Sequence, residues 1–321
     1  MEAYLGIDVG SVTTKFAVLN ESDELVTHVY LPTEGKPIDM VQQGLKQIKQ
    51  QLPKGVDIRG VATTGSARYL AGVIMGADLV KNEITSHAVG ALRYFPEGQT
   101  IIEIGGQDSK IIIIRDGIVT DFGMNTVCAA GTGSFLDHQA LRLNMSIKEF
   151  SQRALDSTTP VRIAGRCTVF AESDMIHKQQ MGHRIEDILY GLCQALVRNY
   201  LNNVGLGKDI QSPIIFQGGV AFNQGIVKAI QEELGSEVIV PPHHEVMGAI
   251  GAALLVHEEM AHSHEGSKFK GFGISEIKYH TSSFECQACP SLCEIAQLSL
   301  NGQVLARWGG RCDLWERSPT S

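Results

Sequence analysis

The sequence predicts an α/β protein made of two related halves and a small Cys-bearing segment. Strand-like and helix-like stretches alternate along most of the chain, which is the pattern of a sheet covered by helices. A short apolar strand, a glycine turn and a second strand occur near the start and again about a hundred residues later. With 321 residues the chain is long enough for about two domains of ordinary size.

The composition is that of a folded protein with an acidic balance. Hydrophobic residues make up 43% and charged residues 19%, which excludes a disordered or fibrous chain. The net charge is −8, and because phosphate contacts need clustered basic residues, we expect no nucleic-acid partner. No apolar run reaches the ~20 residues that span a bilayer. The start MEAYLGIDVG lacks the features of a signal peptide, so we expect a cytoplasmic protein with no membrane partner.

The two hairpins have the same order of elements. In the first, strands at residues 4–9 and 15–19 flank a turn that contains Gly10 and Ser11. In the second, at residues 100–114, the letters IIEIGG, a QDSK turn and the run IIII follow one another. This repetition indicates an internal duplication.

Helical periodicity is clearest at residues 38–51 and 185–204. The second segment carries an apolar stripe, beside which Cys193 is expected to pack in the core. The members of the stripe are Ile188, Leu189, Leu192, Leu196, Tyr200 and Leu201.

These elements divide the chain into three parts. We expect the first half to cover residues 1–95 and to be completed by a helix of small residues at about 246–258. The second half covers residues 96–245. A polar, Gly-containing linker and the Cys-bearing extension occupy residues 261–321.

The first glycine turn has the donors that a phosphate group needs, although a plain hairpin turn with a solvated Lys is the alternative for this motif alone. Exposed backbone N–H groups at a glycine bend approach phosphate oxygens closely. Asp8, just before the bend, can hold Mg²⁺ through water. The candidate binding residues are Gly10, Ser11, Thr13, Thr14 and Lys15.

The second bend, Gly105-Gly106, offers the same backbone donors. Gln107 and Asp108 follow it, and we expect them to position Mg²⁺ and the attacking water. A later strand at residues 214–216 runs into Gly218 and Gly219, which we expect to line the adenine or ribose.

These three elements resemble the phosphate-one, phosphate-two and adenosine segments of the actin, heat-shock chaperone and sugar-kinase superfamily. The motifs MNTVCAAGTGSFLD around Cys128 and GRCTVFAESD around Cys167 resemble the activators of 2-hydroxyacyl-CoA dehydratases and the benzoyl-CoA reductase-type ATPases. Agreement covers residues 1 to about 258. The resemblance implies two actin-like, ribonuclease H-like ATPase domains with a nucleotide cleft between them, plus the C-terminal extension.

The two cysteines of these motifs suit an iron–sulfur ligand role. Each precedes a helix-like segment, at residues 132–143 and 169–179, whose N-terminal amides would favour a thiolate or an anionic cluster. A 4Fe-4S cluster needs four thiolates, and one chain offers two in this context. Two copies of Cys128 and Cys167 across a twofold axis supply four, so we expect a homodimer with one bridging cluster.

The resemblance implies an oxygen-sensitive, ATP-dependent one-electron reductase. It would use ATP/ADP, Mg²⁺ and the bridging 4Fe-4S cluster, accept electrons from ferredoxin or flavodoxin, and pass them to a 2-hydroxyacyl-CoA dehydratase-like iron–sulfur partner. Two alternatives stay open. One is a small-molecule kinase of the same fold with Asp108 or Asp121 as base, and the other is an ATP-switched interaction module without redox chemistry.

Two features depart from the simple family pattern. Glu103 stands where many relatives carry Asp before the second glycine pair. The extension contains a CxxC pair, two further cysteines and the hairpin LSLNGQVLA, whose Asn301-Gly302 suits a type I′ turn. Its cysteines fit a Zn²⁺ ribbon, a second iron–sulfur site or idle thiols: Cys286, Cys289, Cys293 and Cys312. Similar segments occur in reductases of double-cubane cluster proteins, so a partner of that kind is the second possibility.

Overall fold

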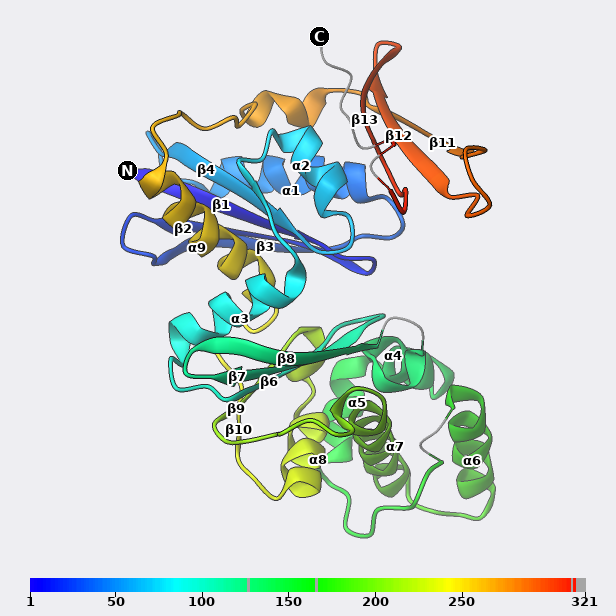
Figure 1. Cartoon of the computed structure of the whole chain (residues 1–321). Coiled ribbons are helices and arrows are strands. Elements are labelled where there is room, and N and C mark those ends of the chain that lie inside the picture. The colour runs from blue at the N-terminus through cyan, green and yellow to red at the C-terminus, as the bar shows by residue number, and fades with distance from the viewer. Residues whose placement is uncertain (126–127, 165–166, 313, 316–321) are drawn as a thin grey trace. The chain divides into compact units, whose positions relative to one another are not determined.

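The structure, a computed structural model shown in Figure 1, describes residues 1–125, 128–164, 167–312, 314 and 315. It consists of two compact units. Unit 1 contains Met1–Ser86 and the chain from Gly248 onward, and unit 2 contains His87–Met247. Each unit has its own sheet and its own hydrophobic core.

The sheet of unit 1 has five strands in the order β3-β2-β1-β4-β5. Three antiparallel strands come first along the chain and two parallel ones follow. The strands are β1 (Glu2–Val9), β2 (Thr13–Asn20), β3 (Leu25–Pro32), β4 (Asp57–Thr64) and β5 (Leu79–Val80). The helices are α1 (Pro37–Gln51), α2 (Arg68–Met75) and α9 (Met247–His262), and the chain crosses into unit 2 within α3 (Glu83–Tyr94).

The sheet of unit 2 repeats this arrangement in the order β8-β7-β6-β9-β10. The first three strands are again antiparallel and the last two parallel. The strands are β6 (Thr100–Ile104), β7 (Ser109–Arg115), β8 (Ile118–Asn125), β9 (Ile214–Gln217) and β10 (Val238–Ile239). The predicted duplication and both predicted hairpins are therefore confirmed.

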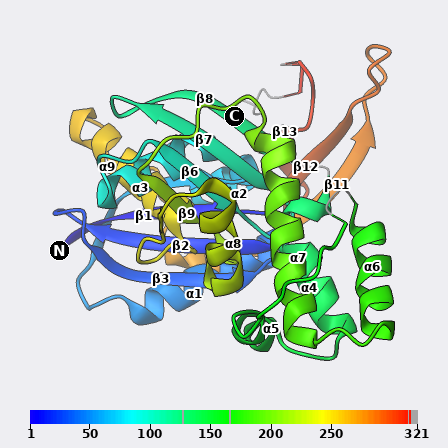
Figure 2. The same cartoon turned by 90° about the horizontal axis from the view of Figure 1, so that it is seen from below.

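The helices of unit 2 gather around one long helix. α7 (Ile185–Tyr200) packs against four helices of this unit, as Figure 2 shows from below. These are α4 (Gly133–Arg142), α5 (Ile147–Ala154), α6 (Thr168–Gln180) and α8 (Gln224–Leu234). A π-helical turn, Leu201–Gly205, extends α7 to the predicted end. Cys193 is fully buried in the core as predicted, and this burial raises the pKa of its thiol.

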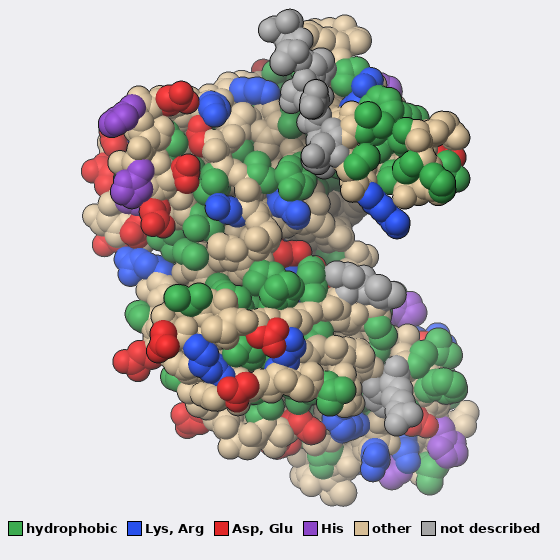
Figure 3. Space-filling model, in the orientation of Figure 1, with side chains coloured by type: hydrophobic (Ala, Val, Ile, Leu, Met, Phe, Trp, Pro, Cys, Tyr) green, Lys and Arg blue, Asp and Glu red, His purple; other side chains and the backbone are tan. Residues whose placement is uncertain are grey.

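The C-terminal extension forms a third sheet that belongs to unit 1. It contains η4 (Phe272–Glu276) and the antiparallel strands β11 (His280–Glu285), β12 (Glu294–Leu300) and β13 (Gln303–Trp308). Asn301 and Gly302 have φ of 50° and 83°, as the predicted tight turn requires. Leu298 is buried in the same apolar cluster as the core of unit 1, and hydrophobic side chains gather over these strands in Figure 3.

Polar contacts also attach the extension. The Gln42 side-chain amide donates to the carbonyls of Ile274 and Ile277 at 2.9 and 2.6 Å. The Asp78 carboxylate accepts from the hydroxyl of Ser267 at 2.7 Å and from the N–H of Lys268 at 2.6 Å. Residues 263–278 are thus held on unit 1 by both core packing and hydrogen bonds. Among the described residues, no helix has the length and apolar character needed to cross a membrane.

The contact between β1 and α9 gives a direct test of unit 1. A Cβ on Gly6 would lie 1.9 Å from the carbonyl oxygen of Ala249 and 2.6 Å from the nitrogen of Ala253, both backbone atoms. We expect Gly6→Ala to lower the free energy of unfolding by about 3 kcal/mol or more, because the helix must shift away from the strand.

Urea unfolding measures this change. Gly266→Ala is the control, since its Cβ would meet nothing within 4 Å, and we expect it to alter stability by less than about 0.5 kcal/mol. Equal stability of Gly6→Ala and the parent protein would contradict the close packing of α9 on β1.

Candidate functional site

In unit 1, two loops follow the carboxyl ends of the adjacent parallel strands β1 and β4. The register pairs Asp8 with Thr64, so both side chains belong to the same end of the sheet. The predicted turn at Gly10 and Ser11 follows β1, and Gly65 with Ser66 follows β4. Ligands of open α/β sheets bind outside this end of the strands.

Asp8 contacts residues on both sides of it, on the neighbouring strand β2 and in the loop after β4. Its side chain is 3% exposed, and its Oδ2 lies 3.0 Å from Nζ of Lys15 on the neighbouring strand. Gly65 has φ of +89°, and a Cβ there would lie 2.5 Å from Asp8 Oδ1. Thr64 Oγ1 is buried and makes no hydrogen bond within the described part of the chain. A glycine at position 65 therefore lets the loop after β4 pack directly against the Asp8 carboxylate.

The hydroxyls of the first turn have different surroundings. Ser11 is exposed and Thr13 is partly exposed. Thr14 is fully buried and hydrogen-bonds the hydroxyl of Thr33 at 2.9 Å, and Thr33 donates to the carbonyl of Gly10 at 2.9 Å. Thr14 therefore supports the conformation of the turn at Gly10 through its buried hydrogen bond to Thr33.

Unit 2 contains the duplicate of the Asp8 pair. Glu103 is paired in register with Lys110, as Asp8 is with Lys15, and both ion pairs measure 3.0 Å. Lys110 also lies 3.0 Å from Asp108 and is 1% exposed. Glu103 is thus the structural counterpart of Asp8 in the second half of the chain.

Glu103 also lies beneath two glycine turns. β6 and β9 are adjacent parallel strands, so Gly105 and Gly218 follow neighbouring strand ends. A Cβ on Gly218, whose φ is +94°, would lie 2.8 Å from Glu103 Oε1, and one on Gly105 would lie 2.8 Å from Asp108 Oδ1. Gly219 opens the 3-10 helix Gly219–Phe222, and Gln107 is exposed. The predicted nucleotide residues of unit 2 therefore all lie at or just after the carboxyl ends of β6 and β9.

The two predicted cluster cysteines are partly exposed free thiols. Cys167 is the N-cap residue of α6, and neither a side-chain cap nor an acidic residue occupies the first turn of that helix. Cys128 precedes the 3-10 helix η1 (Ala129–Gly131), and α4 begins only at Gly133. The prediction of a following helix is thus direct for Cys167, while a short turn intervenes for Cys128.

Asn125 fixes the backbone of Cys128. Its side-chain oxygen accepts from the N–H of Cys128 at 3.0 Å, and its side-chain N–H donates to the Cys128 carbonyl at 2.8 Å. Asn125 is the last residue of β8 and is buried. A single amide thereby anchors the cysteine to the end of the sheet.

The glycine loop after β6 is bonded directly to the segment that follows Cys128. The N–H groups of Gly133 and Ser134 donate to the carbonyls of Gly105 and Gly106, both at 2.8 Å. The Ser134 hydroxyl donates to the same Gly106 carbonyl. Only glycine fits at 133 without a shift, since a Cβ would lie 3.1 Å from the Gly105 oxygen.

A second connection runs through α7. The Tyr200 hydroxyl donates to the Lys110 carbonyl at 2.8 Å, and burial raises the pKa of this Tyr so that it keeps its proton. A Cβ on Gly131 would lie 3.2 Å from Tyr200 Cα, so η1 rests on the same residue. The carboxyl end of β6 and the Cys128 segment are therefore connected both by backbone hydrogen bonds and by contacts with the buried Tyr200.

Several of these residues were missed by the sequence reasoning: Thr64, Gly65, Lys110, Asn125, Ser134 and Tyr200. A signal existed for three of them, Thr64, Gly65 and Lys110. The letters TTGSA after an apolar strand repeat the hydroxyl-and-glycine pattern of the first turn, and the spacing from Asp8 to Lys15 equals that from Glu103 to Lys110. No local pattern marks Tyr200, because its contact depends on how α7 packs.

The residues fit the groups that the resemblance implies. The glycine turns at Gly65 and Gly218 lie within close contact of the Asp8 and Glu103 carboxylates, and Thr64 Oγ1 has no hydrogen bond within the described residues, a set of groups that suits a phosphate with Mg²⁺. The uncapped N-terminus of α6 beside Cys167 suits an anionic thiolate-ligated cluster.

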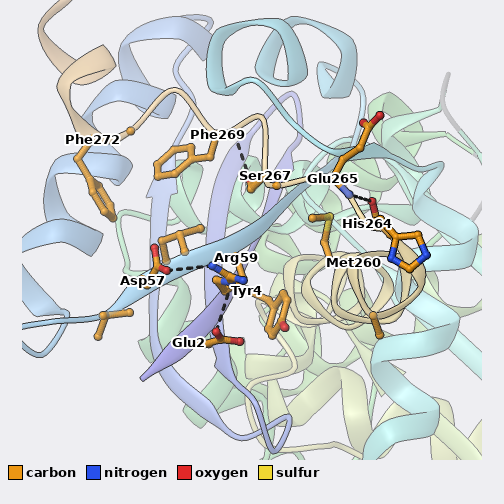
Figure 4. Close-up of a pocket in the computed structure, with 16 residues that line it drawn as sticks. Glu2, Tyr4, Asp57, Arg59, Met260, His264, Glu265, Ser267, Phe269 and Phe272 are labelled. Carbon is orange, nitrogen blue, oxygen red and sulfur yellow. Dashed lines mark hydrogen bonds and ion pairs between the residues drawn. The ribbon is translucent and has the colours of Figure 1, made fainter.

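A separate groove of about 760 Å³ lies elsewhere in unit 1. Figure 4 shows Glu2 and Asp57, at the starts of β1 and β4, paired with Arg59 along one wall, and Met260 and His264 on another. These residues lie at the amino ends of the strands. The groove is therefore at the end of the sheet opposite the glycine loops.

Comparison with known proteins identifies clear relatives. The model of the BadF/BadG/BcrA/BcrD ATPase family matches residues 5–256. The (R)-2-hydroxyglutaryl-CoA dehydratase activating ATPase of Acidaminococcus fermentans is 36% identical over 265 residues, which are 80% of this chain and 98% of that protein.

Solved structures agree with this finding. The activator of the 2-hydroxyisocaproyl-CoA dehydratase from Clostridium difficile with bound ADPNP has a TM-score of 0.73 at 33% identity, covering 81% of this chain and 96% of that one. A ROK family glucokinase from Streptomyces griseus has a TM-score of 0.50 at 12% identity and covers 80% and 99%, a likeness of fold alone. The predicted fold, two actin-like α/β domains with an added C-terminal sheet, is confirmed.

The segment that leads to Cys167 depends on a buried carboxylate. Asp187 at the start of α7 accepts from the Ser157 hydroxyl at 2.8 Å and from the N–H groups of Thr158 and Thr159 at 2.9 Å each. The bond from Thr159 contributes most to lowering the pKa of Asp187, and the other two add to it.

This arrangement predicts a pH-dependent stability. We expect Asp187→Asn to lower the free energy of unfolding at neutral pH by about 1–3 kcal/mol, because hydrogen bonds to a charged acceptor are lost. Because the folded pKa is lowered, the contribution is present above the unfolded value of about 3.9 and is lost as pH falls through the folded value. Urea unfolding at neutral pH and near pH ~3 measures the difference, which should shrink in acid. Asp209→Asn, at an exposed ion pair with Arg115, is the control and should have a much smaller effect. A difference that stays constant in acid would contradict the role of the Asp187 charge.

Proposed function

Because the chain belongs to the BadF/BadG/BcrA/BcrD ATPase family, we propose that it is an ATP-dependent one-electron reductase that activates an iron–sulfur partner enzyme. The observation that carries the proposal is the direct hydrogen bonding of Gly105 and Gly106 to Gly133 and Ser134. These hydrogen bonds join the loop after β6, which we propose contacts the nucleotide, to the segment that follows Cys128, a proposed cluster ligand in the same unit.

ATP and ADP are the proposed nucleotides, since the solved relative carries bound ADPNP. The backbone at Gly10 and Gly105 would contact phosphate oxygens, together with the hydroxyls of Ser11 and Thr13. Asp8 and Asp108 would hold Mg²⁺ through water, and exposed Gln107 would orient the attacking water. Gly218 and Gly219 would lie against the nucleoside.

Cys128 and Cys167 are the proposed ligands of a 4Fe-4S cluster shared by two chains. Such a cluster supplies one-electron transfer at low potential. Two exposed side chains support a contact between copies here: Val169 and Phe170, directly after Cys167, are each 67% exposed. A homodimer would bury them and bring together two cysteines from each chain.

The contacts of unit 2 provide the coupling. When Gly105 and Gly106 move to meet phosphate oxygens, the first turn of α4 must move with them, because both carbonyls are bonded to it. Tyr200 transmits the position of Lys110 to η1 in the same way. Raising an electron by roughly 200 mV costs about 5 kcal/mol, a magnitude that nucleotide hydrolysis can supply.

The proposed acceptor is an iron–sulfur dehydratase-like enzyme or a double-cubane cluster protein, and the proposed donor is ferredoxin or flavodoxin. The relative from Acidaminococcus is named as an activating ATPase of a dehydratase, which favours the first acceptor. The C-terminal extension lies outside the matched residues 5–256, so it can serve a partner of a different kind.

Visible absorption and EPR on protein purified without oxygen test the proposal. After dithionite reduction we expect a signal that ATP perturbs and about four irons per dimer of bridging cluster. Colourless protein that still hydrolyses ATP after iron reconstitution would overturn it. Phosphoryl transfer to a small acceptor would then identify a kinase, and nucleotide-dependent partner binding a switch.

Cysteine variants test the ligands. We expect Cys128→Ala and Cys167→Ala each to lose the cluster iron while retaining nucleotide affinity within about threefold, because neither thiol is at the proposed phosphate edge. Iron analysis and titration with a fluorescent ATP analogue measure both quantities. Cys193→Ala is the matched control, since its buried thiol lies in the core and should keep iron. Full iron content in either ligand variant would exclude that cysteine.

Asp8→Asn tests the metal site. We expect Mg²⁺-dependent ATP hydrolysis to fall by at least about 100-fold with the cluster still present, because the carboxylate that would hold the ion is lost. Asp23→Asn is the control, because it removes the charge of another carboxylate of unit 1, which lies 2.8 Å from His257 Nδ1 beyond the opposite end of β2. Turnover equal to that of the parent protein would remove Asp8 from the site.

A further inference from the structure

All four cysteines of the extension lie at one end of its three-stranded sheet. β11 ends at Glu285, directly before Cys286, and β12 begins at Glu294, directly after Cys293. Glu285 and Glu294 are paired in register, so these two cysteines face each other across the mouth of the loop. Cys289 lies within that loop. β13 runs antiparallel to β12, so it ends where β12 begins, four residues before Cys312.

The loop between β11 and β12 has the contacts of a thiolate-bearing turn. The N–H of Cys286 donates to the Cys293 carbonyl at 2.8 Å and closes the loop. The N–H of Ala288 points at Cys286 Sγ at 3.5 Å. The Trp315 indole N–H donates to the same sulfur at 3.1 Å, so Trp315 lies against Cys286. Donors directed at sulfur stabilise a thiolate.

The arm that carries Cys312 is held against this loop. Gly309 has φ of +104°, and a Cβ there would lie 2.5 Å from the Glu294 carbonyl oxygen, so the backbones are in close approach. The two arms of the extension thus approach each other at the cysteine end.

The extension has little apolar material of its own. In β11–β13 the buried hydrophobic side chains are Ile295, Leu298 and Ala306, and β11 is almost entirely exposed. Small sheets of this kind usually need a disulfide or a metal to stay folded. All four cysteines are free thiols in the structure.

We propose that Cys286, Cys289, Cys293 and Cys312 bind one Zn²⁺ ion as a tetrathiolate site that fastens the two arms of the extension. Four thiolates are a closed structural zinc set, with Zn–S distances of about 2.3 Å. Within the described residues no three of these sulfurs lie within 4.8 Å of one another. Binding therefore draws in the side chains of Cys289 and Cys312, which are exposed and able to turn. The site is separate from the proposed cluster and does not rest on it.

Metal analysis of the full chain tests this site. The Cys128→Ala/Cys167→Ala double variant serves as the background, so that cluster iron does not enter the count. We expect about one zinc per chain after purification with zinc present, and a visible spectrum of tetrahedral thiolate-bound cobalt after exchange with Co²⁺. Cys289→Ser and Cys312→Ser should each reduce bound zinc at least about tenfold. Because both side chains are exposed, these variants avoid disturbing the sheet. Cys193→Ala in the same background should keep full zinc.

Trypsin cleavage provides a second readout. We expect a chelator to accelerate cleavage at Arg307 and Arg311, while cleavage within residues 1–86 stays unchanged.

Three outcomes overturn the proposal: no bound metal, equal zinc in all variants, or iron–sulfur absorbance from the extension instead of zinc. Failure of the ATP-dependent redox signal, by contrast, would leave this zinc count untouched.

Discussion

Two backbone hydrogen bonds hold the candidate machinery of this protein together. The carbonyls of Gly105 and Gly106 accept from the first N–H groups of α4, so a helix N-terminus is capped by the glycine loop itself. Both partners are main-chain groups, which means that neither end can move alone without leaving a polar group unpaired. Asn125 then ties Cys128 to the end of β8, a strand of the same sheet. The loop, the helix and the cysteine backbone therefore behave as one mechanical element.

The duplication explains the electrostatics of the sheet ends. Each half presents a buried carboxylate on its first strand and a Lys directly opposite on the second, at the same register position. A buried carboxylate is costly unless it is paired, so each Lys makes its carboxylate tolerable at the strand end. Lys110 differs from Lys15 because it pairs with two carboxylates, Glu103 and Asp108. At this end of the strands, unit 2 therefore has two acidic groups around one Lys, where the Asp8 pair of unit 1 has one.

The extension adds a third sheet without forming an independent core. Leu298 shares the apolar cluster of unit 1, and residues 263–278 are fixed to it by side-chain and backbone hydrogen bonds. Trp308, the last residue of β13, also packs against this cluster, so the support reaches the end of the sheet that carries the cysteines. The extension therefore adds to unit 1 a surface that lies outside the family match at residues 5–256.

The sequence by itself determined the duplicated hairpins, the long helices and the candidate ligands. Each of these depends on local facts: strand alternation, 3.6-residue periodicity, and glycines where the chain must turn. It also determined Cys193 as a core residue, because the thiol lies beside an apolar helical stripe. Only the tertiary structure decided that Thr14 supports the turn after Asp8 through its hydrogen bond to Thr33. It alone decided that Tyr200 and Ser134 connect the β6–β7 loop region to the segment that follows Cys128. These contacts join residues 19 to 90 positions apart, and their partners are chosen by sheet register and helix packing, which no local pattern encodes.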